Sequence, residues 1–344
     1  MLPERITWRE SPGEHESLAV AVRAVLAAGR LEADFDDLCA ALGTAFTAVS
    51  VDDGSPPGWW MTFGRDLFLD RAAGLYGLRL RALHPPEVGL DMTAAEEFPQ
   101  HYEFSCLPLI EEALRHGQPV IAWQGWPGQA WGGWGVITGA GPAGLEGFAP
   151  GCGGQRVVMT GPAVQCYVVE ELEPVEPEPW QIMRMAVRHA DVFMNHAPLI
   201  APTSLRPRIR TGPVAFDAWQ DWLGRETCVG TPRAPGWCEH RQHAELVASA
   251  RASALRVLQR GPLTLGPQAR PLLADAAAAC GALIEALAES RDPVRAEALM
   301  ADPCGRETLL EAVTRAEAAD RRLAIIVEEL AGMLEDSAGP VDEP

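Results

Sequence analysis

Five short apolar segments follow one another in the middle of the chain, and turn residues separate each from the next. They cover residues 119–123, 134–138, 144–148, 155–159 and 164–170. Gly and Pro are frequent between them, as in the stretch 139–144, and both residues favour turns. Helical patterns precede this run, and helices followed by adjacent strands are typical of an α+β domain. The sequence therefore predicts an α+β fold with an antiparallel sheet.

The helices expected ahead of the sheet are marked by their end signals. Ser11, Pro12 and Glu14 have the spacing of a capping box with Pro at the first helical position. Gly29 is suited to end that helix, so we expect a helix over 11–28. Further elements are expected at 35–42 (helix), 65–76 (helix), 78–82 (strand) and 105–117 (helix).

An acidic, proline-rich stretch over 170–179 separates the strands from a long helical region. Such a composition favours an extended, solvated chain. The domains that we predict are a first domain over 1–172, a linker over 173–179, a mainly α-helical domain over 180–336 and a disordered acidic tail over 337–344. The helices expected in the second domain cover 180–195, 213–223, 243–259, 267–289, 293–300 and 304–334.

The charge of the chain disfavours some classes of partner. The formal net charge is −19 over 344 residues, and none of the basic residues is Lys. A surface this negative repels nucleic acids and anionic membranes. No apolar run reaches the roughly 18–20 residues that a membrane-spanning helix needs, and the N-terminus has no apolar core of a secretory signal. We expect a cytoplasmic protein that binds no nucleic acid and does not insert into membranes.

Several short motifs of the first half occur in a recognisable order. They are H-E-S-L at 15–18, L-x-x-x-L-G-x-x-F at 38–46, G-Q-P-V-I-A at 117–122, W-G-G-W-G-V-I-T-G at 131–139 and F-A-P-G at 148–151. In this order they resemble the papain-like cysteine peptidases that cut bacteriocin leader peptides, and the N-terminal domain of butirosin-biosynthesis type acyltransferases. The motif G-x-x-A-x-x-x-W at 212–219, with His243 and Arg251 after it, is similar to a helix that follows that domain in many such proteins. The resemblance implies a papain-like first domain.

The resemblance also implies a catalytic site, and this chain departs from it at every position. The family uses a Cys thiolate at a helix N-terminus, a His as base, and an Asp or Asn that orients the His. The nucleophile position falls here on His15 or Glu16. The His position falls on Gly133 or Trp134, and the Asp position on Ala149. We therefore expect the fold to persist without the cysteine chemistry.

A rebuilt active site stays open as an alternative. Ser17 lies near the same helix start, although residues two apart on a helix, such as His15 and Ser17, point away from each other. Glu16 could take part in acid–base catalysis, or it could serve the helix dipole as acidic residues in a first turn do. Cys106 follows Ser105 at an expected helix N-terminus, where a thiolate would be stabilised, so it is a further nucleophile candidate.

Tryptophans gather in the loops and in one strand of the first domain. The residues that could line an apolar cleft with a few polar contacts are Trp59, Trp60, Trp126 and Trp131, together with Gln124. The alternative is that these rings pack the edge of the sheet against the first helix, because aromatic residues dominate cores as well as pockets.

Cys238, His240 and His243 have the most metal-like spacing in the chain. Zinc takes Cys and His ligands at such separations, and Cys228 could add a fourth. Structural zinc sites commonly use paired CxxC knuckles, however, and the sequence contains none. The alternative is a loop and a helix start with ordinary polar residues. We expect no cofactor other than this zinc ion.

Three functions remain in view. The first is a catalytically degenerate, cysteine-peptidase-like protein that binds a peptide, a small molecule or a protein partner in the former catalytic cleft. The second is an acyltransferase or amide hydrolase with a rebuilt active site. The third is a metal-stabilised subunit of a larger protein assembly. The long amphipathic helix expected at 304–334 could serve a homodimer or a complex, or it could pack within the chain.

Overall fold

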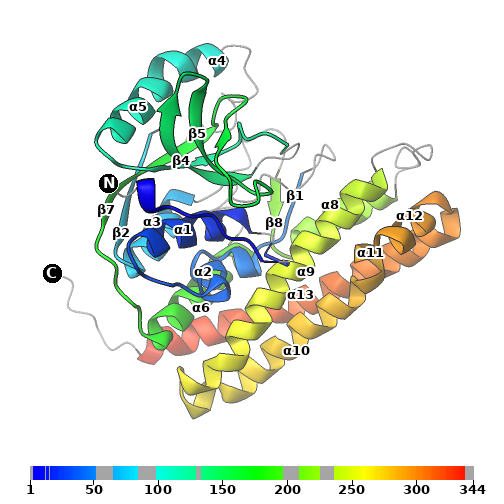
Figure 1. Cartoon of the computed structure of the whole chain (residues 1–344). Helices are drawn as coiled ribbons and strands as arrows, with labels where there is room; N and C mark the ends of the chain where they lie inside the picture. Colours follow the sequence, from blue (N-terminus) through cyan, green and yellow to red (C-terminus); the bar gives the residue numbers. More distant parts are fainter. Residues whose placement is uncertain are drawn as a thin grey trace. The chain divides into compact units, whose positions relative to one another are not determined.

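The structure, a computed structural model, describes residues 3–11, 13–14, 16–51, 65–83, 98–128, 133–196, 209–224 and 236–337 (Figure 1). The chain divides into two units. The first comprises Met1–Leu38 and Met61–Pro177, and the second comprises Cys39–Trp60 and Glu178–Pro344. Residues 39–60, which the sequence analysis placed in the first domain, thus group with the second unit.

The first unit contains an antiparallel sheet. Its six strands are β2 (Leu78–Ala82), β3 (Val120–Trp123), β4 (Trp134–Gly141), β5 (Gly144–Phe148), β6 (Val157–Val158) and β7 (Gln165–Leu172). Their order across the sheet is β2-β7-β3-β4-β5-β6, and every neighbouring pair is antiparallel. The expected α+β class with an antiparallel sheet is confirmed.

The strand register decides which side chains share a face of this sheet. Trp123 pairs with Gln165 of β7 on one side and with Trp134 of β4 on the other, so the three side chains form a row on one face. The opposite face belongs to an apolar cluster that includes Val120, Ala122, Ile137, Cys166 and Val168 together with Phe98, Tyr102, Cys106, Ile110 and Ala113. Helices α4 (Phe98–His101) and α5 (Leu107–Arg115) cover that face, and α1 (Ser17–Ala28) lies against β4 on the other (Figure 1).

Helix α1 begins at Ser17, so the expected start at Ser11 is wrong. The predicted turn itself is present, because the Glu14 carboxylate accepts a hydrogen bond from the Ser11 N–H at 2.9 Å. It cannot continue as a helix, however, because Gly13 has a φ of 91°, which lies in the left-handed region. Glu16 caps the helix instead, with its side chain accepting from the Leu18 N–H.

The helix expected from Ser105 begins earlier, at Phe98. It runs through α4 (Phe98–His101), a π-helical turn (Tyr102–Cys106) and α5 (Leu107–Arg115). The Ser105 hydroxyl lies 3.4 Å from Nδ1 of His101, one turn before it in the helix, instead of capping a helix start. Two further α-helices described before β3 are α2 (Phe35–Ala41), which crosses the boundary between the two units, and α3 (Arg65–Leu75).

The second unit is mainly helical. The α-helices described there are α6 (Pro179–Asn195), α8 (Val214–Leu223), α9 (Gly236–Arg260), α10 (Arg270–Ala286), α11 (Ala288–Arg291), α12 (Pro293–Ala301) and α13 (Pro303–Ser337). Helix α13 packs against α6, α8, α10 and α12. Asp292 caps α12 as the Asp–Pro pattern predicts, since its carboxylate accepts from the N–H groups of Val294 and Arg295. The predicted tail, apart from Ser337, lies outside the described residues.

A buried ion pair joins two of these helices to the segment that precedes β1. Nη2 of Arg251, on α9, lies 2.7 Å from Oδ1 of Asp320, on α13, and both side chains are fully buried. Nη1 of Arg251 also donates to the carbonyl of Ala45 at 3.0 Å. Arg251 therefore holds residues 44–46 against the helices of the second unit.

The residues that follow this segment form part of a small sheet in the second unit. Strand β1 (Val49–Val51) pairs antiparallel with β8 (Ile209–Thr211). The sequence analysis missed both strands, because three residues are too few to show an alternating pattern. No helix in the described parts of the chain is long and apolar enough to cross a membrane.

Candidate functional site

The start of helix α1 holds a buried carboxyl group. Glu16 is only 7% exposed, and its Oε1 accepts a hydrogen bond from the Leu18 N–H at 2.9 Å. Its other oxygen, Oε2, is buried without a hydrogen-bond partner among the described residues. Burial raises the pKa of Glu16 to about 7, although the hydrogen bond from Leu18 acts in the opposite direction. Glu16 can therefore gain or lose a proton near neutral pH.

The structure brings the start of α1 against the start of β4. The backbone N–H of Trp134 donates a hydrogen bond to Oγ of Ser17 at 3.0 Å. The Trp134 side chain is almost fully buried, and its ring centroid lies 5.9 Å from that of Tyr167. The indole Nε1–H of Trp134 has no partner within the described part of the chain. Two of the predicted site residues, Ser17 and Trp134, are thus in direct contact.

Gln165 adds a further polar group to the same face of the sheet. Its side chain is fully buried, and neither atom of its amide has a hydrogen-bond partner in the described ranges. The sequence analysis missed this residue. The sequence signal for Gln165 is a polar residue inside an apolar strand, at a position where the alternating pattern predicts a core residue. In the structure it pairs with Trp123.

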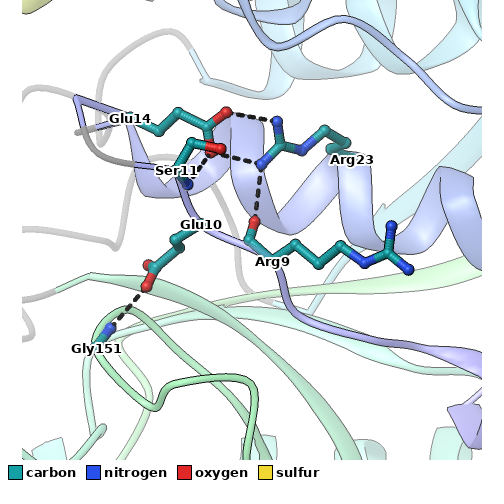
Figure 2. A network of polar contacts seen from close by, with 6 residues as sticks. All are labelled: Arg9, Glu10, Ser11, Glu14, Arg23 and Gly151. Atoms are coloured by element: carbon teal, nitrogen blue, oxygen red, sulfur yellow. Dashed lines mark hydrogen bonds and ion pairs between the residues drawn. The ribbon is translucent and has the colours of Figure 1, made fainter.

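The chain leading into α1 is fixed by a network of charged groups, which Figure 2 shows. Nη2 of Arg23, on α1, lies 2.6 Å from Oε2 of Glu14 and donates to the carbonyl of Arg9 at 2.8 Å. Burial would raise the pKa of Glu14, but the hydrogen bonds from Arg23 and Ser11 outweigh it, and the pKa is lowered. Glu10 accepts from the Gly151 N–H at 3.0 Å, which links this segment to the turn after β5.

The two candidate tryptophans that the structure describes, Trp126 and Trp134, lie on opposite faces of the sheet. Trp126 packs in the apolar cluster of the α5 side, and its indole N–H donates to the carbonyl of Ala122 at 3.2 Å. Trp134 lies on the opposite face of the sheet. Gln124 is half-buried and has a φ of 67°, which is uncommon for a residue other than glycine. The candidates that lie outside the described residues are His15, Trp59, Trp60 and Trp131.

Cys106 has none of the features of an activated thiol. It lies inside the continuous helix 98–115, so no free helix N-terminus stabilises a thiolate. Burial raises the pKa of the Cys106 thiol, which lowers the fraction of the reactive thiolate at neutral pH. Nδ1 of His101 contacts the hydroxyl of Ser105 instead of serving as a base for this sulfur.

His240 and His243 pack around Trp219 of α8. The Trp219 ring stacks on His243, with centroids 4.2 Å apart and planes 2° apart, and its Nε1–H donates to Nδ1 of His240 at 3.2 Å. Burial lowers the pKa of both histidines to about 3. Because Nδ1 of neutral His240 accepts, its proton is on Nε2.

This arrangement offers little to a metal ion. Cys238 is exposed, whereas both histidines are buried against Trp219. No group of three His, Cys, Asp or Glu side chains among the described residues could hold one ion. Cys228 lies outside them.

No protein-family model matches this chain, and no curated protein matches it. The fold and the site therefore define it on their own as an α+β protein with a buried carboxyl group at the start of its first long helix.

Proposed function

We propose that this chain is a catalytically degenerate, cysteine-peptidase-like protein that binds a peptide, a small molecule or a protein partner at the start of α1. One observation carries the proposal. Where the resemblance requires a cysteine at a helix N-terminus, the chain has His15 or Glu16, and Glu16 is buried with one oxygen unpartnered among the described residues.

A carboxyl group in this place supports binding better than acyl transfer. A thiolate at a helix N-terminus is a strong nucleophile, whereas a carboxylate is a weak one unless a site activates it. Oε1 of Glu16 is also committed to the Leu18 N–H. Oε2, which is buried and has no partner among the described residues, is the atom to which we assign a hydrogen bond from a ligand.

The raised pKa of Glu16 favours a second candidate, an acyltransferase or amide hydrolase with a rebuilt site. A carboxyl group with a pKa of about 7 can both donate and accept a proton at neutral pH, as a general acid or base must. Ser17 is the adjacent hydroxyl, but its oxygen accepts from the Trp134 N–H. Among the described residues, the side chains of Glu16 and Ser17 form no hydrogen bond with each other, so the binding function is preferred.

The net charge of −19 supports partners other than nucleic acids. We include a cytoplasmic location in the proposal. Partners that carry positive or neutral groups suit this surface better. We include a complex or a homodimer in the proposal, with the 35-residue helix α13 as the candidate contact helix.

The test combines a binding assay and an activity assay on the full chain. The midpoint of thermal unfolding is measured with a panel of di- and tripeptides and small polar metabolites, for wild type and E16Q. Hydrolysis of fluorogenic peptide amides and acyl transfer from a thioester are measured for wild type, S17A and C106A. We expect a ligand that raises the midpoint in wild type and not in E16Q, and no turnover.

Either of two results would reject the proposal. Turnover in wild type that S17A or C106A abolishes would establish the enzyme candidate instead. If no ligand of the panel raises the unfolding midpoint more in wild type than in E16Q, the start of α1 is not the binding site.

A further inference from the structure

The helix that runs from α4 into α5 exposes a large apolar side chain. Phe104 is 74% exposed. Pro108, four residues later, is exposed as well, and Leu109 is 38% exposed. Residues four apart in a helix are neighbours on its surface, so Phe104 and Pro108 form one apolar strip with Leu109 beside it. Aromatic side chains are enriched in the contact surfaces between proteins.

The packing of this helix explains why position 104 faces solvent, but not why it holds a Phe. The buried residues recur at every fourth position, namely Phe98, Tyr102, Cys106 and Ile110. An α-helix has about 3.6 residues per turn, so such a series would turn away from the sheet by roughly 40° at each step. The wider π-helical turn Tyr102–Cys106, in which the Leu107 N–H donates to the Tyr102 carbonyl, takes up this drift. A polar side chain at position 104 would serve the same packing.

Acidic residues surround the apolar strip. Glu103, Glu111 and Glu112 are exposed on the same helix. No ion pair or side-chain hydrogen bond joins their carboxylates to another of the residues that the structure describes. The helix 98–115 contains one Arg and no Lys, and that residue, Arg115, lies in the last turn of α5, where its charge complements the helix dipole. The charge around Phe104 is therefore negative and uncompensated within the helix.

We propose that the surface formed by Phe104, Pro108, Leu109 and the three glutamates docks a segment of a partner protein that carries Arg or Lys on both sides of an apolar side chain. The apolar side chain covers Phe104 and removes it from water. The cations pair with the glutamates at the rim of the contact. The net charge of −19 draws such a partner toward the chain.

Charge selects this occupant over others. A second copy of the chain docked here by twofold symmetry would place the same three glutamates against one another, and like charges repel. The phosphate groups of nucleic acids and anionic lipids meet the same repulsion. Helices α4 and α5 cover the face of the sheet opposite α1 (Figure 1), so this docking surface is separate from the proposed function and does not depend on it.

The experiment measures the binding of three fluorescein-labelled peptides of equal length to the full chain by fluorescence anisotropy. The first is an amphipathic helix of Leu and Arg. The second has Glu in place of every Arg, and the third has the residues of the first in an order without an apolar face. We expect the first peptide to bind most tightly, with an affinity that falls as salt screens the charges. F104A should weaken this binding by roughly tenfold, as the loss of an aromatic anchor does.

Two variants test the apolar and the acidic parts of the surface. V294A is the control for F104A, because Val294 is 77% exposed on α12, and it should leave binding unchanged. E103Q/E111Q/E112Q keeps the shape of the surface and removes its charge. This variant should weaken the binding of the basic peptide and reduce its dependence on salt.

A matched charge control separates the surface from the overall charge of the chain. E32Q/E285Q/E297Q neutralises three exposed glutamates elsewhere and should weaken binding much less. Equal losses in the two triple variants would overturn the proposal. Equal binding of the acidic or the rearranged peptide, equal effects of F104A and V294A, or no binding of any peptide would overturn it as well.

Two further measurements examine the other occupants. Concentration-dependent dimerisation of the chain alone, followed by sedimentation and abolished by F104A, would assign the surface to a second copy. Binding to phosphatidylcholine–phosphatidylserine liposomes that F104A abolishes would assign it to a membrane. Either result overturns the proposal, and we expect neither.

Discussion

Arg251 and Asp320 form an ion pair at 2.7 Å with no exposed surface on either side chain. Arg251 also holds the Ala45 carbonyl. Removing one partner of a buried pair leaves an uncompensated charge and typically costs about 3–5 kcal/mol. We expect D320N to lower the free energy of unfolding by this amount in chemical denaturation. The matched control is E289Q in the exposed pair Arg295–Glu289, which should change it by less than about 1 kcal/mol.

The second prediction is that the helical unit needs residues 39–60 in order to fold. Residues 39–60 supply β1, which pairs with β8, and the carbonyls that Arg251 binds. A fragment of residues 178–344 alone should therefore lack cooperative thermal unfolding and near-ultraviolet circular dichroism. Joining residues 39–60 to it through a flexible linker should restore both signals. A cooperative transition in the fragment alone would show that the segment is dispensable.

The third prediction follows from the pKa of Glu16. Its pKa in the folded state, about 7, lies above the ordinary glutamate value of 4.5 that applies in the unfolded chain. The folded protein therefore binds the proton more tightly than the unfolded chain. This contribution to stability is complete below pH 4.5 and is lost as the pH rises to 7, by about 1.4 kcal/mol for each pKa unit. E16Q does not titrate and should remove this slope from the free energy of unfolding measured against pH. The same slope in E16Q would show that another group causes it.

The fourth prediction has the opposite sign and concerns the second unit. The pKa values of His240 and His243 fall from 6.5 to about 3 on folding, so the unfolded chain binds their protons more tightly. Their contribution to stability is complete above pH 6.5 and declines as the pH falls toward 3. H243F, which keeps an aromatic ring against Trp219, should reduce the acid loss. Between pH 4.5 and 6.5 the Glu16 and histidine effects oppose each other, so the single variants are needed to separate them.

The fifth prediction tests the thiols. Cys238 and Cys304 are exposed, whereas Cys106 and Cys166 are buried, and burial raises the pKa of both buried thiols. In a C228S background, iodoacetamide at pH 7.5 should label the exposed pair first, as followed by peptide mass spectrometry. Cys106 should react no faster than Cys166. Preferential labelling of Cys106 would identify it as an activated nucleophile.

The parts of the fold that sequence could predict are those with local signals. The strands between 119 and 170 carry their own apolar pattern and turns, and Asp292 followed by Pro is a complete helix start. The start of α1 was misplaced because a capping box at Ser11 is a local signal too. The left-handed backbone of Gly13 prevents the helix from starting there. Glycine adopts positive and negative φ almost equally readily, so the sequence alone does not show which it takes.

The candidate site was predictable only in part, because its groups meet through long-range pairing. The motif order pointed to Glu16, Ser17 and Trp134, and the structure joins the last two. Gln165 shows in the sequence only as a polar residue inside an apolar strand, and its register with Trp123 cannot be predicted from a local pattern. The same holds for His240 and His243, whose spacing suggested zinc. Their partner is the ring of Trp219, which lies on another helix.

The assignment of residues 39–60 to the second unit also has a consequence for biosynthesis. These residues leave the ribosome well before Arg251 and Asp320 are translated. Until then the carbonyl of Ala45 lacks its partner Arg251, and β1 lacks its partner β8 until β8 has been translated. The second unit can therefore reach its final form only near the end of translation. During that interval the early segment is a natural place for a chaperone to bind the nascent chain.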